Sequence, residues 1–362
     1  MTATSGAEER AMRRALDLAA RSNPHPNPRV GAVILDAAGR VIAEGWHVAP
    51  GEAHAEQAAL ADLGGPPPEG ATMVVTLEPC DHHGRTPPCT RAILEAGISR
   101  VVVGTVDPDS RVGGGGIQHL QEAGVEVEVG LLGSEVEAAD PGYFHHRRHG
   151  RPRITLKTAV TLDGQTAAAD GTSQWITGTE ARRDAHILRS RADAVMIGAG
   201  TLRADDPSLT VRLEGYDGRH PRPVVVAGSE PLPPGASVWQ RPGALVVAIT
   251  DPGVGVEAVL VDPAPNGLPR LDQALQELGR RGVLEILAEG GATLAAGLWN
   301  RDLIDAGVTY VGARIGGGGG LPPLAGTWQT FGDSQPVRIT RVEPVGADVR
   351  IDWAPVREST TA

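Results

Sequence analysis

The feature that most constrains the fold of this chain is a regular alternation of short apolar runs with segments of helical spacing. The first series predicts helices over 8–21, 54–64, 89–97 and 115–124, and strands over 29–36, 41–48, 71–79, 99–107 and 126–132. A turn at Ala38-Gly39 separates the first two strands. Strands that alternate with helices predict an α/β domain, whose parallel or mixed sheet carries helices on both faces.

The segment DPGYFHHRRHGRP (140–152) interrupts this alternation with polar, turn-forming residues, and we interpret it as a solvated linker. A second α/β series follows, over 153–160, 181–190, 192–200, 222–228, 244–250, 271–282, 283–291 and 305–317. Gly316–Gly320 reads as a flexible surface loop. Because 362 residues exceed what one core usually holds, we predict two domains, 8–146 and 152–355.

Charge and hydropathy argue against two classes of partner. A net charge of −11 argues against nucleic acid, because phosphate binding needs a basic surface. No run approaches the roughly 18 apolar residues that a membrane span requires. The first ten residues lack the apolar region of a secretory signal. We therefore expect a cytoplasmic protein with neither a membrane nor a nucleic-acid partner.

Four residues form a candidate zinc site. His54 and Glu56 begin a predicted helix, Cys80 follows a strand, and Cys89 opens another helix. One imidazole and two thiolates match a catalytic zinc site, which has three protein ligands and an open position. Residues two apart lie about 200° around a helix, so His54 and Glu56 converge only where the chain enters the first turn. Glu56 would carry a proton from zinc-bound water to a leaving amine.

The two cysteines are separated by DHHGRTPP, which is longer than the two-residue spacer of base deaminases. Gly84 and Pro87-Pro88 would let this insert loop out, which places His82, His83 and Arg85 at the mouth of the site. The alternative is a closed structural zinc site with His82, His83 or His47 as a fourth ligand. A carboxylate beside the histidine would have no role in such a site.

A second candidate site contains Lys157, the one lysine among 33 basic residues. It lies in LKTAVTLDGQTA (156–167), and a strand end follows at IGAGTLRADDPSLTVR (197–212). EGGATLAAG (289–297) leads from a strand into a helix, whose first amides can bind a phosphate. Taken singly, the lysine could be a chance placement and the glycines an ordinary helix cap.

HAE (54–56), TLEPC (76–80), HHGRTPPC (82–89) and PNPRVGAV (26–33) closely resemble the bifunctional deaminase/reductase family of bacterial riboflavin biosynthesis. The resemblance runs from about Ala11 to Gly317. It implies a cytidine-deaminase-like three-layer α/β/α domain that hydrolyses the 2-amino group of a diaminopyrimidinone ribosylamine phosphate. The substrate contacts that it implies are Asn27, His47, His82, Arg85 and Asp107.

This chain departs from the family pattern at two of these places. It has DPDS (107–110) where the family usually has DPNP, and Arg85 where lysine is frequent. These departures weaken the assignment of substrate contacts at Asp109 and Arg85, and they do not affect the candidate metal site. For His47, an ordinary partly buried histidine is the alternative.

For the second half, the resemblance implies a dihydrofolate-reductase-like α/β domain that uses NADPH to reduce the ribosyl group to ribityl. The implied NADPH contacts are Ala159, Trp175, Thr201, Asp205, Ser229, Gly291, Ala292, Thr293 and Leu294. The implied substrate contacts are Ser173, Arg189, Leu209, Arg212 and Glu289. Lys157 and Asp205 are the expected proton donor and acceptor. Arg189 could instead be a surface cation, and Ser229 lies in VVVAGS, where the family usually has Asp-Ser after VVL.

Two other functions compete with this interpretation. One is a nucleic-acid base deaminase with a C-terminal extension, and the other is a zinc-stabilised scaffold without activity. Release of ammonia and oxidation of NADPH with the pyrimidine substrate would separate them. We also expect a homo-oligomer, either a dimer or a tetramer.

Overall fold

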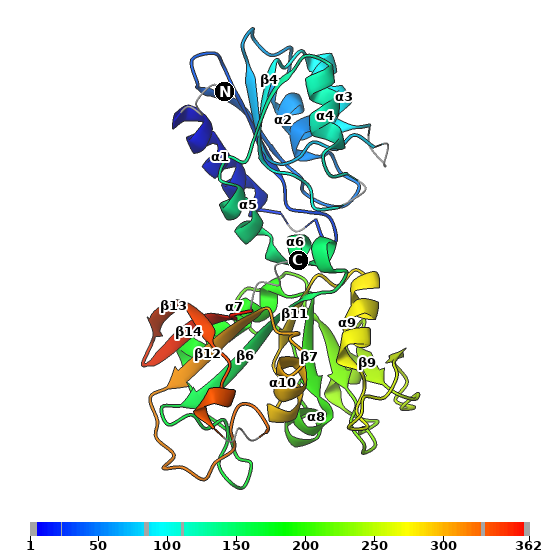
Figure 1. The fold of residues 1–362 in the computed structure, drawn as a ribbon, viewed down its shortest axis with the longest axis vertical. Helices are drawn as coiled ribbons and strands as arrows, with labels where there is room; N and C mark the ends of the chain where they lie inside the picture. The colour runs from blue at the N-terminus through cyan, green and yellow to red at the C-terminus, as the bar shows by residue number, and fades with distance from the viewer. Residues whose placement is uncertain (1–5, 23, 83–86, 110–111, 327–329, 358–362) are drawn as a thin grey trace. The chain divides into compact units, whose positions relative to one another are not determined.

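The computed structural model describes residues 6–22, 24–82, 87–109, 112–326 and 330–357. The chain forms two compact units, residues 1–150 and 151–362, which run from blue to green and from green to red in Figure 1. The predicted domain bounds, 8–146 and 152–355, stay a prediction beside this division. In the described part of the chain, no helix combines the length and apolar character that crossing a membrane requires.

The first unit is a five-stranded mixed sheet with the order β2-β1-β3-β4-β5. Strand β1 is antiparallel to both of its neighbours, whereas β3, β4 and β5 are parallel. The strands are β1 (Gly31–Leu35), β2 (Val41–Trp46), β3 (Thr72–Leu77), β4 (Arg100–Thr105) and β5 (Glu126–Val129). The helices are α1 (Gly6–Ala19), α2 (Ala55–Leu63), α3 (Cys89–Ala96), α4 (Gly115–Glu122), α5 (Gly133–Ala139) and α6 (Pro141–His149).

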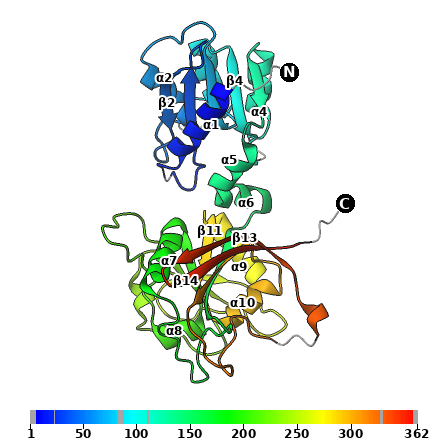
Figure 2. The ribbon, with the colours of Figure 1, turned by 90° about the vertical axis from the view of Figure 1, so that its left-hand side faces the viewer.

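Helices cover both faces of this sheet (Figures 1 and 2). Successive residues of β1 show why, because Ala32 and Ile34 pack with α2, α3 and α4, while Val33 and Leu35 pack with α1, α5 and α6. All five residues of β1 are buried. The predicted three-layer α/β/α arrangement is therefore confirmed, and it follows from strands that are apolar on both faces.

The interpretation of 140–152 as a solvated linker is wrong. Residues Pro141–His149 form helix α6, with proline in its first turn and Gly150 in the left-handed conformation after its end. Tyr143 and Phe144 are buried in the core against α1 and the sheet. The sequence did not indicate this helix, because the run HHRRH is basic and only two adjacent aromatic residues form the buried face.

The second unit is a nine-stranded sheet with the order β10-β9-β8-β7-β11-β6-β12-β14-β13. It is parallel from β10 to β12, and β14 and β13 are antiparallel additions. The strands are β6 (Arg153–Thr161), β7 (Ala194–Gly198), β8 (Arg222–Val226), β9 (Leu245–Ala248), β10 (Glu257–Leu260), β11 (Glu285–Ala288), β12 (Ala306–Gly312), β13 (Val337–Val345) and β14 (Asp348–Pro355).

The helices of the second unit also lie on both faces of its sheet. They are α7 (Thr179–Arg191), α8 (Ala199–Asp205), α9 (Leu271–Arg280) and α10 (Ala292–Trp299), with short 3-10 turns at η1 (Ser237–Gln240) and η2 (Phe331–Asp333). Apolar residues of α9 and α10 pack on one face, and those of α8 and η1 pack on the other.

Sequence reasoning did not predict α8, β10 or the hairpin β13–β14. Strand β13 lies at the edge of the sheet and is mostly exposed, so it lacks an apolar signature. Strand β14 buries Arg350, which pairs with Asp184 and Asp352 at 2.8 and 2.7 Å. Paired charges at buried positions weaken the apolar alternation that identifies a strand.

Gly45 in β2 sets how closely α2 approaches the sheet. A Cβ atom at this position would lie 2.4 Å from the Ala55 carbonyl oxygen and 2.3 Å from the Ala59 amide nitrogen. Both contacts are with backbone atoms, which cannot rotate away. Because His54 and Glu56 stand at the start of α2, glycine at position 45 also sets the depth of these two side chains.

We expect Gly45→Ala to destabilise the first unit by about 1–3 kcal/mol, because the added methyl group must displace α2. Urea unfolding of the purified protein measures this change through the transition midpoint. Gly65→Ala is the matched control, since its Cβ would meet nothing within 4 Å. Equal midpoints for the two variants would contradict the close approach.

Candidate functional site

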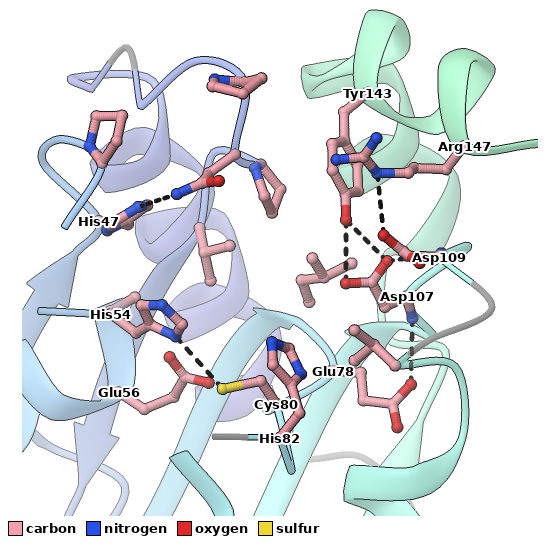
Figure 3. Close-up of a pocket in the computed structure, with 18 of the residues that line it drawn as sticks. His47, His54, Glu56, Glu78, Cys80, His82, Asp107, Asp109, Tyr143 and Arg147 are labelled. Atoms are coloured by element: carbon pink, nitrogen blue, oxygen red, sulfur yellow. Dashed lines mark hydrogen bonds and ion pairs between the residues drawn. The ribbon is translucent and has the colours of Figure 1, made fainter. Parts of the chain in front are cut away.

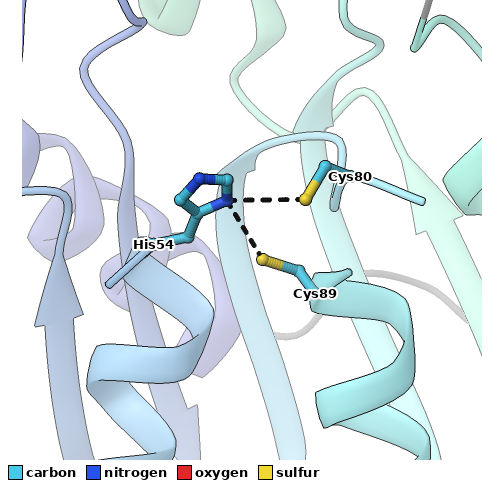
Figure 4. Close-up of side chains that lie close together, drawn as sticks. All are labelled: His54, Cys80 and Cys89. Carbon is cyan, nitrogen blue, oxygen red and sulfur yellow. Dashed lines mark hydrogen bonds between the residues drawn. The ribbon is translucent and has the colours of Figure 1, made fainter. Parts of the chain in front are cut away.

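His54, Cys80 and Cys89 converge on one point in the first unit (Figure 4). His54 is the N-cap of α2 and has an extended backbone, with φ −70° and ψ 162°. Its Nδ1 lies 3.4 Å from the Cys80 Sγ and 3.3 Å from the Cys89 Sγ. Cys80 follows the carboxyl end of β3, and Cys89 is the first residue of α3. Residues far apart in sequence thus meet where two helices begin.

These donors fit a zinc ion. Tetrahedral coordination with Zn–S near 2.3 Å and Zn–N near 2.05 Å requires an N···S separation of about 3.5 Å. All three donor atoms lie within 4.8 Å of one another, and the described ranges contain no other group of three or more His, Cys, Asp or Glu ligand atoms this close together. Three ligands leave one position open for water or substrate, as a catalytic zinc site requires.

The alternative of a closed site is not favoured by the described histidines. Both ring nitrogens of His47 are occupied, Nε2 by the Asn27 side-chain amide at 3.2 Å and Nδ1 by the Ala53 carbonyl at 3.1 Å. His82 is exposed and lines the same pocket without joining the donor cluster. His83, Gly84 and Arg85 lie outside the described residues.

The thiols and the neighbouring carboxyl group titrate abnormally. A hydrogen bond from the Cys89 thiol does most to stabilise the Cys80 thiolate, and a hydrogen bond with His54 adds to this effect. Together they lower the pKa of Cys80 to about 4. Glu56 is 3% exposed, and its burial, together with the Cys80 charge, raises its pKa to about 7. A carboxyl group with a pKa in this range can exchange protons near neutral pH.

A cavity of about 680 Å³ opens onto these groups (Figure 3). Four of the five predicted deaminase substrate contacts line it, namely Asn27, His47, His82 and Asp107. Since the Asn27 amide donates to Nε2, the Nδ1–H of His47 donates to Ala53, and burial lowers the pKa of this histidine. The ring is therefore neutral and held in place, and its direct contact with substrate stays a prediction.

Glu78 lines the pocket, and sequence reasoning did not single it out. Its buried carboxylate accepts four backbone N–H bonds, from Asp107 and Gly114 on one oxygen and from Gly116 and Ile117 on the other, at 2.9–3.2 Å. It therefore joins the end of β3 to the loop after β4 and to the first turn of α4. Its position directly after an apolar strand, two residues before a candidate metal ligand, was the available signal.

Helix α6 contributes two further side chains to the pocket. The Tyr143 hydroxyl donates to both carboxylate oxygens of Asp107, at 2.9 and 3.1 Å. The Arg147 Nε lies 3.3 Å from Asp109 Oδ2, and its guanidinium carbon is 4.9 Å from the centre of the Tyr143 ring. Figure 3 shows the two residues on one wall of the pocket, facing the carboxylates. Their spacing of four along a helix was the sequence signal, once a helix was recognised.

In the second unit, Lys157 and Glu289 meet at the centre of the sheet. The β6–β11 register pairs Leu156 with Ala288, so the residues that follow them, Lys157 and Glu289, lie side by side. Lys157 Nζ is 3.9 Å from Glu289 Oε2. Arg189 of α7 binds the same carboxylate through Nε at 2.8 Å and Nη2 at 2.9 Å. Burial raises the pKa of Glu289, but the two cations outweigh this effect and leave the pKa below its ordinary value.

His186 joins this cluster, although sequence reasoning did not identify it. Its Nδ1 accepts the backbone N–H of Arg212 at 3.2 Å. Burial and the charges of Arg189 and Arg212 lower the pKa of His186 to about 4, so the ring is neutral at physiological pH. Its position one helical turn before Arg189 was the available signal. His186 thus holds the chain segment that carries Arg212.

Two of the predicted NADPH-binding segments are joined by a hydrogen bond. The Gly291 N–H donates to Thr201 Oγ1 at 3.0 Å, which links α8 to the N-cap of α10. Ala292 and Thr293 begin α10, whereas Leu294 is buried in the core. The helix start that the sequence predicted is therefore present.

The remaining predicted reductase residues lie in varied settings. Ala159 is on β6 opposite Tyr310, and Leu209 is buried with φ 52°. Trp175 is 57% exposed, and the Arg182 guanidinium carbon lies 4.5 Å from its ring centre. Asp205 ends α8 and is exposed, so the carboxylate that lies beside Lys157 is that of Glu289. Ser173, Ser229 and Arg212 are also exposed.

Two family models match the chain. The cytidine and deoxycytidylate deaminase zinc-binding region matches residues 5–105, and the RibD C-terminal domain matches residues 152–350. The first match contains all three candidate zinc ligands. The second contains Lys157, Arg189 and Glu289.

Whole-length relatives are similar to both halves together. Riboflavin biosynthesis protein RibD of Escherichia coli is 39% identical over 361 residues, with 94% of this chain and 98% of the relative covered. RibD of Aquifex aeolicus is 36% identical, with 94% and 96% covered.

Solved structures agree with these sequence matches. Acinetobacter baumannii RibD superposes with a TM-score of 0.88 at 33% identity, covering 97% of this chain and 99% of that one. The diaminohydroxyphosphoribosylaminopyrimidine deaminase/5-amino-6-(5-phosphoribosylamino)uracil reductase of Thermotoga maritima superposes with a TM-score of 0.86 at 34% identity and the same coverage. The chain belongs to the RibD family of riboflavin biosynthesis proteins, and it joins a zinc-binding deaminase domain to a reductase domain.

Proposed function

We propose that the chain catalyses two successive reactions of riboflavin biosynthesis. The first is zinc-dependent hydrolytic deamination of 2,5-diamino-6-(5-phosphoribosylamino)pyrimidin-4(3H)-one, and the second is NADPH-dependent reduction of the ribosyl group to ribityl. The observation that carries the proposal is the convergence of His54, Cys80 and Cys89 beside buried Glu56 in a pocket of about 680 Å³. The Thermotoga maritima relative bears both activities in its name.

In the deaminase pocket, His54, Cys80 and Cys89 would hold the zinc ion, which supplies the Lewis acidity that activates water. Glu56 would accept the proton of that water and deliver it to the departing amino group, which leaves as ammonia. Asn27, His47, His82, Arg85 and Asp107 stay the predicted substrate contacts. Glu78 would act indirectly, because it fixes the backbone on both sides of Asp107.

In the reductase unit, Lys157 would supply the proton that opening of the ribosyl ring requires. The Glu289 carboxylate, 3.9 Å from Nζ, would orient this ammonium group. Asp205 stays the predicted acceptor. Arg189 uses three N–H groups on Glu289 and the Thr210 carbonyl, so it would orient Glu289 as well as contact substrate. Arg212 is the freer candidate for the substrate phosphate.

The predicted NADPH contacts would bind the hydride donor. They are Ala159, Trp175, Thr201, Asp205, Ser229 and residues 291–294, with exposed amides at the start of α10 available for a phosphate group. The predicted substrate contacts are Ser173, Leu209 and Glu289 with the two arginines. Assembly into a homo-oligomer stays a prediction.

An assay that separates the two reactions tests the proposal. With the diaminopyrimidinone substrate and zinc, we expect ammonia release without NADPH, and oxidation of added NADPH only after deamination. A zinc chelator should abolish ammonia release yet leave reduction of the deaminated intermediate intact. Ammonia release from cytidine oligonucleotides would favour a nucleic-acid deaminase, and no release from any substrate would favour a scaffold.

We expect Glu56→Gln to lower the deaminase kcat by about 10²–10⁴-fold, because the amide cannot accept a proton. Zinc content, measured by mass spectrometry, should stay at one ion per chain, since Glu56 is not a ligand. Reduction of the deaminated intermediate is the internal control. Wild-type ammonia release in a zinc-loaded variant would refute the proton-shuttle role.

Lys157→Arg should fold normally but lose most reductase turnover, because the guanidinium holds its proton too tightly to donate it. An NADPH oxidation assay with the deaminated intermediate measures this loss. Arg153→Lys, on the same strand and paired with Glu285 at 3.5 Å, is the matched control. The role of Lys157 fails if its variant reduces the intermediate at the wild-type rate.

A further inference from the structure

The deaminase pocket has an unusual balance of charge. Its described lining residues include five carboxylates, from Glu52, Glu56, Glu78, Asp107 and Asp109, and a single guanidinium, that of Arg147. The substrate proposed above carries a phosphate, which acidic walls repel. A pocket built to receive such a substrate needs a cation placed where the phosphate enters.

Arg147 is held in place from two sides. Asp109 Oδ2 forms an ion pair with Nε at 3.3 Å that lacks hydrogen-bond geometry, and the guanidinium carbon lies 4.9 Å from the centre of the Tyr143 ring. The Tyr143 hydroxyl is in turn bound to Asp107. The Arg147 side chain is 21% exposed, so little freedom remains to be lost when a ligand binds. Figure 3 shows Arg147 across the pocket from His47.

The ion pair between Arg147 and Asp109 also offsets a negative charge that would repel the substrate phosphate. Unpaired, the Asp109 carboxylate would stand at the pocket wall and repel a phosphate dianion. The Arg147 guanidinium offsets that charge through Nε. A guanidinium carries five N–H donors in a planar fork. Nε of Arg147 faces Asp109 and Nη1 lies 3.1 Å from His146 Nδ1, so the two N–H groups of Nη2 are the donors left to bind a phosphate.

We propose that Arg147 of α6 binds the phosphate of the deaminase substrate, with Asp109 and Tyr143 orienting its guanidinium. This inference rests on the function proposed above. It gives α6, the segment whose sequence suggested a solvated linker, a part in recognition of the substrate.

The test compares Arg147→Leu with Arg148→Leu in the zinc-loaded full-length chain. Arg148 is a matched control, since it pairs with Glu137 at 2.8 and 2.6 Å, lies 5.5 Å from the Phe144 ring centre and does not line the pocket. Ammonia release is measured with the phosphorylated substrate and with its dephosphorylated form. We expect Arg147→Leu to lower kcat/KM by about 10- to 100-fold for the phosphorylated form, mainly through KM.

The dephosphorylated form should react equally with Arg147→Leu and wild-type protein, and Arg148→Leu should match wild type with both forms. Equal losses with the two forms would overturn the inference, because they would indicate a structural role. The double variant Asp109→Asn/Arg147→Leu should stay at least about tenfold impaired with the phosphorylated form. Recovery to the wild-type rate would show that Arg147 only neutralises Asp109, and would overturn the inference.

The same experiment separates this inference from the function on which it rests. Wild-type protein that releases no ammonia from either form would overturn the proposed function, and the inference with it. Wild-type deamination that is unchanged by Arg147→Leu would overturn the inference alone. Ammonia release from the dephosphorylated form by each variant verifies that the deaminase unit is folded.

Discussion

The deaminase site depends on one buried carboxylate that is neither a metal ligand nor a proton carrier. Glu78 binds four backbone N–H groups from the loop after β4 and from the first turn of α4. A buried anion is stable only with such partners, so removal of either side would leave the other unsatisfied. Through Glu78, the strand that presents Cys80 also fixes the backbone that presents Asp107.

The reductase unit is organised in a comparable way. Glu289 directly follows β11, as Glu78 directly follows β3, and each carboxylate collects donors from neighbouring segments. In both sheets the groups stand at the carboxyl ends of parallel strands, where loops from adjacent strands meet. The difference lies in the donors. Glu78 is bound by backbone amides, whereas Glu289 is bound by the charged side chains of Lys157 and Arg189.

Much of the deaminase site could be predicted because its chemistry is local in sequence. His54 and Glu56 lie two residues apart at a helix start, and the two cysteines stand at a strand end and a helix start. Helix α6 could not be predicted in the same way. Its buried face is the pair Tyr143 and Phe144, and their neighbours are basic, so neither periodicity nor composition revealed a helix that packs on the core.

The sequence by itself determined the two α/β units, the identity of the candidate metal donors, the neighbouring carboxylate and the lone lysine. These follow from periodicity and residue type, which are properties of short segments. Only the tertiary structure decided which charges meet. It placed Glu289 rather than Asp205 beside Lys157, Glu78 beneath the Asp107 loop, and Arg147 against Asp109. Such pairs form between segments that strand register and helix packing bring together, and no single segment carries that information.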